Sequence, residues 1–144
     1  MDSISIEQQL RQDPVIKKAL ELSPDEVYAR GYEAWQQQDY DSALVDFGWL
    51  VMNEPWSWRA HVAFAGAMMM KQEYQQAISY YGYALMLDVC DPEPMYQIAV
   101  CLNALGDCSA AREALQIALT MSYDDPSYST VRVNAEKMLS QLLA

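Results

Sequence analysis

The chain has 144 residues and a mass of 16.4 kDa, which is the size of one domain. Apolar residues make up 52% of it and charged residues only 20%, which excludes intrinsic disorder as its main state. Its formal net charge of -11 opposes binding to nucleic acid and direct binding to an anionic membrane surface.

Residues 1–22 are expected to form an N-terminal helical arm. The sequence starts without the cationic and apolar pattern of a signal peptide, and it has no apolar run of membrane-spanning length. We therefore expect a cytoplasmic protein whose three cysteines stay reduced. The apolar side of the arm either docks on the domain that follows or contacts a second copy of the chain. The arm's candidate dimerisation residues are Ile4, Ile6, Leu10 and Ile16.

A 34-residue repeat follows the arm. Four good N-cap residues recur in this phase, and each directly precedes a proline or Trp58; they are Ser23, Ser57, Asp91 and Asp125. This spacing predicts helices that begin at residues 24, 58, 92 and 126, and Ser23 with Glu26 predicts a capping box at the first of them. Small residues also recur in phase, as do large ones. The small set includes Gly31, Ala65 and Ala99, and the large set is Phe47, Tyr81 and Leu115.

The repeat predicts an all-α fold. Residues 23–125 are expected to form three helix-turn-helix units, at 24–57, 58–91 and 92–125, because recurring small residues let two helices approach closely. Residues 126–144 are expected to form a C-terminal capping helix, as an open helical stack requires. In the first unit Arg30 and Ala34 stand where larger apolar residues are usual, which weakens that helix as core.

These spacings and residue types resemble the tetratricopeptide repeat. In such stacks the first helix of each hairpin lines a concave face, so the residues of the groove can be chosen from fixed positions. The positions chosen carry no charge, and Arg30 and Arg59 look isolated beside them. We therefore expect an apolar, aromatic groove that suits apolar segments of another protein. Its residues are Tyr28, Tyr32, Trp35, Val62, Gly66, Met69, Met70, Tyr96, Val100 and Asn103.

Catalysis is not expected. The chain has one histidine, His61, which stands at a repeat packing position and is interpreted as a residue in or near the core. The sequence contains no paired metal ligands and no glycine-rich phosphate loop, and Cys101 and Cys108 have neither zinc nor redox spacing. The sequence thus indicates a protein that is not an enzyme and that uses no metal or cofactor.

The order of arm and repeats, together with the run YARGYEAWQQQDYDSALVDF at residues 28–47, resembles the class II chaperones of bacterial type III secretion systems. The resemblance implies a cytosolic, all-helical homodimer that holds a hydrophobic translocator or an effector before export. It also implies that an extended client segment lies in the groove against Tyr28, Tyr32 and Trp35, with Met69, Met70 and Tyr96 continuing the groove.

Two other functions are compatible with such repeats. One is a chaperone for a needle subunit, whose groove would hold an amphipathic helix instead of an extended segment. The other is a general scaffold or adaptor between folded proteins. The bound conformation of the client distinguishes the first, and the instability of the client on its own distinguishes the second.

Overall fold

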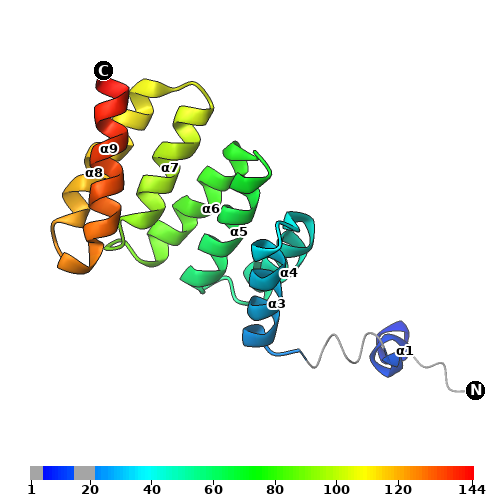
Figure 1. Cartoon of the computed structure of the whole chain (residues 1–144). Helices are drawn as coiled ribbons and strands as arrows, with labels where there is room; N and C mark the ends of the chain where they lie inside the picture. Colours follow the sequence, from blue (N-terminus) through cyan, green and yellow to red (C-terminus); the bar gives the residue numbers. More distant parts are fainter. Residues whose placement is uncertain (1–4, 15–21) are drawn as a thin grey trace, which may run out of the picture.

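The computed structural model describes residues 5–14 and 22–144, and its elements in these ranges are all helices (Figure 1). The all-α class is therefore confirmed. No helix in the described ranges is long and apolar enough to cross a membrane. The elements are α1 (Ile6–Gln12), α3 (Pro24–Gln36), α4 (Tyr40–Asn53), α5 (Trp58–Met70), α6 (Tyr74–Leu87), α7 (Glu93–Ala104), α8 (Cys108–Ser122), the 3-10 helix η1 (Pro126–Tyr128) and α9 (Ser129–Leu143).

Helices α3 to α8 form three successive antiparallel hairpins that stack side by side (Figure 1). The first helices, α3, α5 and α7, form one layer, and the second helices, α4, α6 and α8, form the other. Each helix also packs against the next one along the chain, and α9 packs on α8 at the end of the stack. This arrangement places the first helices in a row along one face, where they position the candidate site.

Three of the four predicted N-caps are present and one differs. The Ser23 hydroxyl accepts from the Glu26 N–H at 3.2 Å in a complete capping box, the Ser57 hydroxyl caps α5, and the Asp125 carboxylate caps η1 by accepting from the Ser127 N–H. Asp91 accepts from the Glu93 N–H in an Asx turn, and the N-cap of α7 is Pro92. As a result α7 starts at residue 93, and residue 126 begins a 3-10 turn that delays α9 to residue 129.

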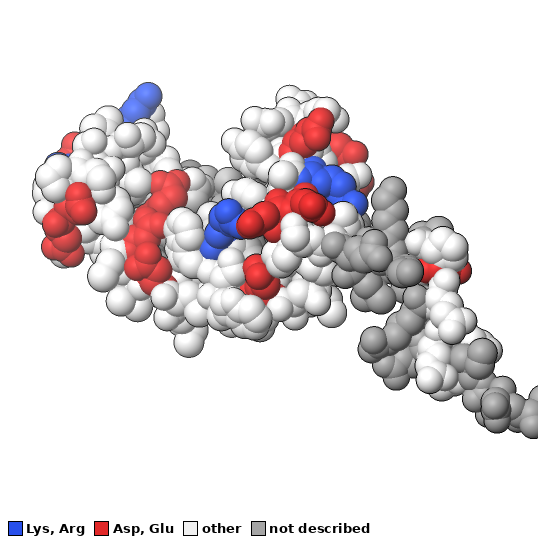
Figure 2. Space-filling view, turned by 90° about the horizontal axis from the view of Figure 1, so that it is seen from below, with Lys and Arg blue, Asp and Glu red and all other residues white. Residues whose placement is uncertain are grey.

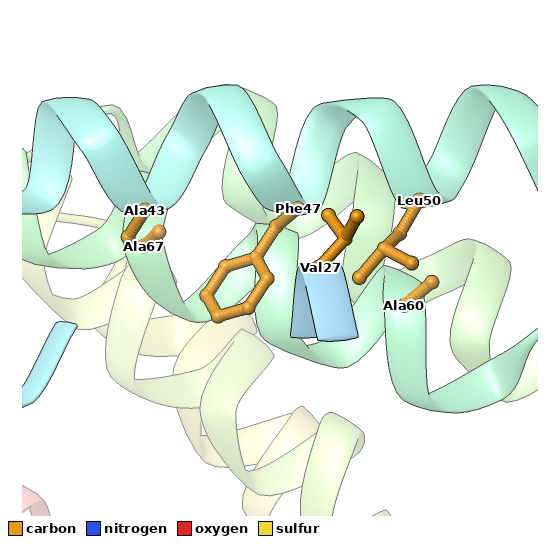
Figure 3. Packing of buried hydrophobic residues seen from close by; sticks show 6 residues of the cluster. All are labelled: Val27, Ala43, Phe47, Leu50, Ala60 and Ala67. Carbon is orange, nitrogen blue, oxygen red and sulfur yellow. The ribbon is translucent and has the colours of Figure 1, made fainter. Parts of the chain in front are cut away.

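The predicted close approach of small residues to large ones is present in the first hairpin. A Cβ atom added to Gly31 would lie 2.7 Å from the ring of Phe47, so α3 and α4 pack with no space between them. Figure 3 shows the Phe47 ring pointing from α4 into the space between Val27 and the alanines Ala43 and Ala67, while Ala60 lies next to Leu50. Alanines at these buried positions let neighbouring helices lie close together, while Phe47 fills the remaining gap.

Two polar residues are part of the packing. Arg30 does not fill the core, as expected, but its guanidinium forms two hydrogen bonds, at 2.9 and 2.7 Å, with the buried carboxylate of Asp46 on α4. This bond to Asp46 raises the pKa of Arg30. His61 is buried, as predicted, and its Nε2–H donates to the Pro55 carbonyl at 2.8 Å while its ring packs against Tyr80.

The turns between the paired helices repeat the same backbone conformation. Gln38, Gln72 and Gly106 stand 34 residues apart, each directly after the C-cap residue of an inner helix, and have φ values of 64°, 62° and 88°. This left-handed conformation ends a helix and favours glycine, since a Cβ atom is strained there. Only the third turn carries glycine.

Candidate binding groove

A cavity of about 320 Å³ opens on the layer of first helices. Its walls come mainly from α3 and α5, its floor includes side chains of α4 and α6, and one end is formed by the start of α7. Figure 2 shows the hollowed face of the molecule, on which uncharged residues predominate and acidic groups stand on both sides of the hollow. The cavity residues are Tyr28, Tyr32, Trp35, Phe47, Trp58, Arg59, Val62, Ala63, Gly66, Met69, Tyr81, Glu93 and Gln97.

One wall is a row of stacked aromatic rings on α3. The ring centroids of Tyr28 and Tyr32 lie 6.3 Å apart at 8°, and those of Tyr32 and Trp35 lie 6.2 Å apart at 10°. Tyr28 rests on the core ring of Phe47, whereas Tyr32 remains 46% exposed. The row is therefore anchored at its base and lines the cavity, where an apolar ligand would lose contact with water.

The facing wall comes from α5. Val62, Gly66 and Met69 all line the cavity, at the positions that correspond, 34 residues on, to the three aromatics of α3. At Gly66 a Cβ atom would lie 3.7 Å from the Tyr81 hydroxyl, so the missing side chain leaves the floor of the cavity open. The structure thus brings together the predicted groove residues of the first two repeats, except Met70.

The third repeat places its groove residues elsewhere. Tyr96, Val100 and Asn103 line a second hollow of about 420 Å³ between α7 and α9. Met70 is 43% exposed and borders a different depression, near the first two hairpin turns, beside Lys71. The predicted groove is therefore two hollows, and Met70 belongs to neither. The other residues of the second hollow are Asn134, Lys137, Met138, Gln141 and Leu142.

The cavity also contains charged residues that the sequence analysis did not select. The Arg59 guanidinium lies 4.2 Å from the Tyr28 ring centroid and 3.0 Å from the Asp25 carboxylate, so the expectation that Arg59 is isolated was wrong. Glu93 lies at the other end of the cavity. Residues 25, 59 and 93 share one repeat phase, and this spacing is the signal that would have predicted that they lie near one another.

Two tyrosines near Glu93 keep their protons. Burial, followed by the charges of Cys101 and Glu93, raises the pKa of Tyr81, and burial with the charge of Glu93 raises that of Tyr96. Both hydroxyls therefore remain donors at neutral pH. In the described residues no group of three or more histidine, cysteine or acidic side chains is placed to hold a metal ion.

The arm provides less structural detail. Ile6 lies on α1 with 75% of its surface exposed, and Leu10 lies on the same helix, although its side chain is outside the described part of the chain. Ile4 and Ile16 fall outside the described residues. The role of the arm in dimerisation accordingly stays a prediction.

Comparison with known proteins gives consistent relatives, although no family model matches the chain. The low calcium response locus protein H of Yersinia pseudotuberculosis is 22% identical over 142 residues, covering 96% of this chain and 84% of that protein. PcrH of Pseudomonas aeruginosa, in complex with the chaperone binding region of PopD, has a TM-score of 0.80 and 25% identity, covering 85% of this chain and 95% of that one.

A third similar protein is the type III secretion translocator chaperone SycD of Yersinia enterocolitica. Its structure has a TM-score of 0.77 and 21% identity, and the match covers 93% of this chain and 95% of that one. SycD is also known in an alternative dimer and in complex with a peptide of the translocator YopD. The hairpin stack, the cavity on its inner layer and these relatives agree with the resemblance noted in the sequence: in sequence and in fold, the chain is similar to the translocator chaperones of type III secretion systems.

Proposed function

We propose that this chain is a bacterial cytoplasmic chaperone that holds an extended segment of a hydrophobic translocator, or of an effector, before export. The observation that carries the proposal is the row of Tyr28, Tyr32 and Trp35, whose stacked rings line the cavity and whose middle member, Tyr32, is 46% exposed. Exposed aromatic surface of this kind is costly in water unless a partner covers it. The complexes of PcrH and SycD with segments of their translocators support the same role.

The client segment is proposed to lie along the aromatic row, with Val62 and Met69 on its other side. Tyr96, Val100 and Asn103 then continue the path in the second hollow. Met70 stands apart from both hollows, so we assign it no contact with the client there.

The expected affinity of an isolated segment is modest. Three apolar anchors buried in the groove contribute roughly 5–9 kcal/mol in total. Ordering a disordered segment costs about 2–5 kcal/mol. The difference leaves no more than about 7 kcal/mol, which corresponds to micromolar or weaker binding. A complete client is therefore expected to make further contacts outside the groove.

The proposal is tested by affinity purification of the tagged protein from its native cells, with mass spectrometry of stoichiometric partners. Wild type is compared with Tyr32→Ala and Trp35→Ala, after circular dichroism has shown that both variants are folded. Trp56→Ala is the matched control, because this exposed tryptophan does not line the cavity.

Recovery of a secreted protein with apolar, membrane-seeking segments, lost in the two groove variants and kept in the control, supports the proposal. A small needle-like subunit bound as an amphipathic helix, or only folded cytosolic partners, contradicts it. The first result would indicate a needle-subunit chaperone and the second a scaffold.

Homodimerisation through the arm is part of the proposal. Removal of residues 1–20 is expected to lower the mass in solution, as measured by light scattering during size-exclusion chromatography. An unchanged mass would mean that the arm does not join two copies.

A further inference from the structure

A row of three charges runs along the inner layer, and two of them, Arg59 and Glu93, line the cavity. Asp25, Arg59 and Glu93 occupy the same position in three successive repeats and therefore follow one another along the inner layer. Arg59 has two partners: it forms an ion pair with the Asp25 carboxylate at 3.0 Å and a cation–π contact with the face of the Tyr28 ring. Its charge is thus already compensated within the chain.

Glu93 has no such charged partner among the described residues. Its Oε1 atom accepts from the Gln97 amide at 2.8 Å, and in residues 5–14 and 22–144 no lysine or arginine forms an ion pair with it. The side chain is half-buried and lines a cavity that is otherwise mostly apolar. A carboxylate in such surroundings is stabilised most by a cation that approaches through the cavity.

Two uncharged polar groups in the same cavity also lack partners. Tyr81 is only 3% exposed and lines the cavity, and its hydroxyl makes no hydrogen bond within the described part of the chain. The indole N–H of Trp58 is buried and likewise has no partner among the described residues. Buried polar groups are almost always hydrogen-bonded, so the Trp58 N–H and the Tyr81 hydroxyl on the cavity floor are groups that a ligand in this cavity can bind.

We propose that the groove selects a client segment that carries a lysine or arginine, whose charged head binds the Glu93 carboxylate and the Tyr81 hydroxyl. The apolar stem of that side chain lies along Val62 and over Gly66, where the missing Cβ leaves room for it. An acidic client residue is disfavoured because Arg59, the one cation among the described residues that line this cavity, already has Asp25 and Tyr28 as partners. The inference rests on the proposed function, since it concerns a client in the same groove.

The probe is a set of acetylated and amidated synthetic peptides in which three apolar anchor residues are held constant. Each remaining position carries lysine, glutamine or glutamate in turn, and binding is followed by fluorescence anisotropy at low and high salt. The proteins are wild type, Glu93→Gln, Tyr81→Phe and the control Glu73→Gln, which removes an exposed acid outside both hollows. Thermal unfolding of each variant checks its fold.

We expect wild type to bind one lysine peptide about tenfold more tightly than its glutamine counterpart at low salt, and the difference to shrink at high salt. Glu93→Gln is expected to lose this preference while keeping its affinity for the glutamine peptide, and Tyr81→Phe to reduce it. The preference should persist in Glu73→Gln.

The failures of the two ideas are distinguishable. Equal binding of lysine, glutamine and glutamate peptides by wild type, or an unchanged lysine preference in Glu93→Gln, overturns the charge selection and leaves the groove function intact. Binding of no peptide of any charge overturns both.

Discussion

The two hollows of the inner layer are built from equivalent repeat positions and nevertheless differ in chemistry. The first lies between α3 and α5 and has stacked aromatic rings on one wall and Val62 and Met69 on the other. The second lies between α7 and α9 and is lined by three carboxamides and Lys137 as well as by apolar side chains. The difference shows that a repeat position places a side chain on the inner face, whereas the helix opposite determines the site it joins.

The neighbour of α7 explains the contrast. In the first hollow both walls are inner helices of repeats, so one phase of the sequence supplies both. In the second hollow the facing wall is the capping helix α9, which is outside the repeat and carries Asn134, Lys137 and Gln141 toward the hollow. We therefore expect the first hollow to contribute most of the apolar binding energy, and the following predictions test this division.

The largest effect is expected on client affinity, and it is tested by substitutions at two equivalent repeat positions, Tyr32 and Val100. Tyr32→Ala should weaken the binding of a client segment about 10- to 100-fold, since it removes a partly exposed ring from the first hollow. Val100→Ala in the second hollow should change affinity only a few-fold. Isothermal titration with the client recovered by affinity purification measures both. Similar losses in the two variants would contradict the division.

The next largest effect is expected on the pH dependence of stability. It arises in α7, where Cys101 stands at the position that Ala67 occupies in α5. Burial raises the pKa of the Cys101 thiol to about 11. Its contribution to stability is fully present below the pKa of the unfolded thiol, near 9.0, and is lost as pH rises toward 11 because only the unfolded chain ionises.

Urea unfolding between pH 8 and 11 checks this linkage. The free energy of unfolding of wild type should fall by up to about 2 kcal/mol more than that of Cys101→Ala, in which the two inner helices become alike at this position. The exposed Cys108→Ala should behave as wild type. Parallel curves for wild type and Cys101→Ala would show that the buried thiol has no such role.

A smaller effect is expected from the two inner glycines. Gly31→Ala should lower the free energy of unfolding by about 1–2 kcal/mol, because its methyl group would press on the buried Phe47 ring at 2.7 Å. Gly66→Ala should preserve stability or raise it slightly, since its methyl group meets only the Tyr81 hydroxyl at 3.7 Å. Chemical denaturation of both variants makes the comparison, and equal destabilisation would mean that the floor at Gly66 is as tightly packed as the hairpin at Gly31.

The smallest effect is expected at the hairpin turns. Gln38→Gly and Gln72→Gly should each raise the free energy of unfolding by about 0.5–1 kcal/mol, since they relieve a left-handed backbone that glycine adopts without strain. Gly106→Ala should lower it by about 1 kcal/mol at the third turn. Thermal melting of the three variants suffices, and a loss of stability in either glutamine variant would indicate that the glutamine side chain supports its turn.

Much of the fold could be predicted because its causes are local. The 34-residue phase of caps, small residues and large residues indicated three hairpins, and the capping box at Ser23 and the Gly31–Phe47 contact are both present. The predicted start at residue 126 is present as η1, whose N-cap is Asp125, whereas α7 starts one residue later than predicted because Asp91 closes an Asx turn. The choice between a cap and an Asx turn depends on backbone angles that residue type alone leaves open.

The candidate site could likewise be predicted in part from the sequence. The sequence by itself determined most of the uncharged residues that face the inner layer, all but Met70 of those chosen, because helical periodicity and the repeat phase specify a face. Only the tertiary structure decided that α3 and α5 share one cavity, that α7 turns its groove residues toward α9, and that Arg59 pairs with Asp25 while Glu93 stays unmatched. The physical reason is that these groupings depend on how successive hairpins stack and curve, and that geometry is set by packing between helices distant in the sequence.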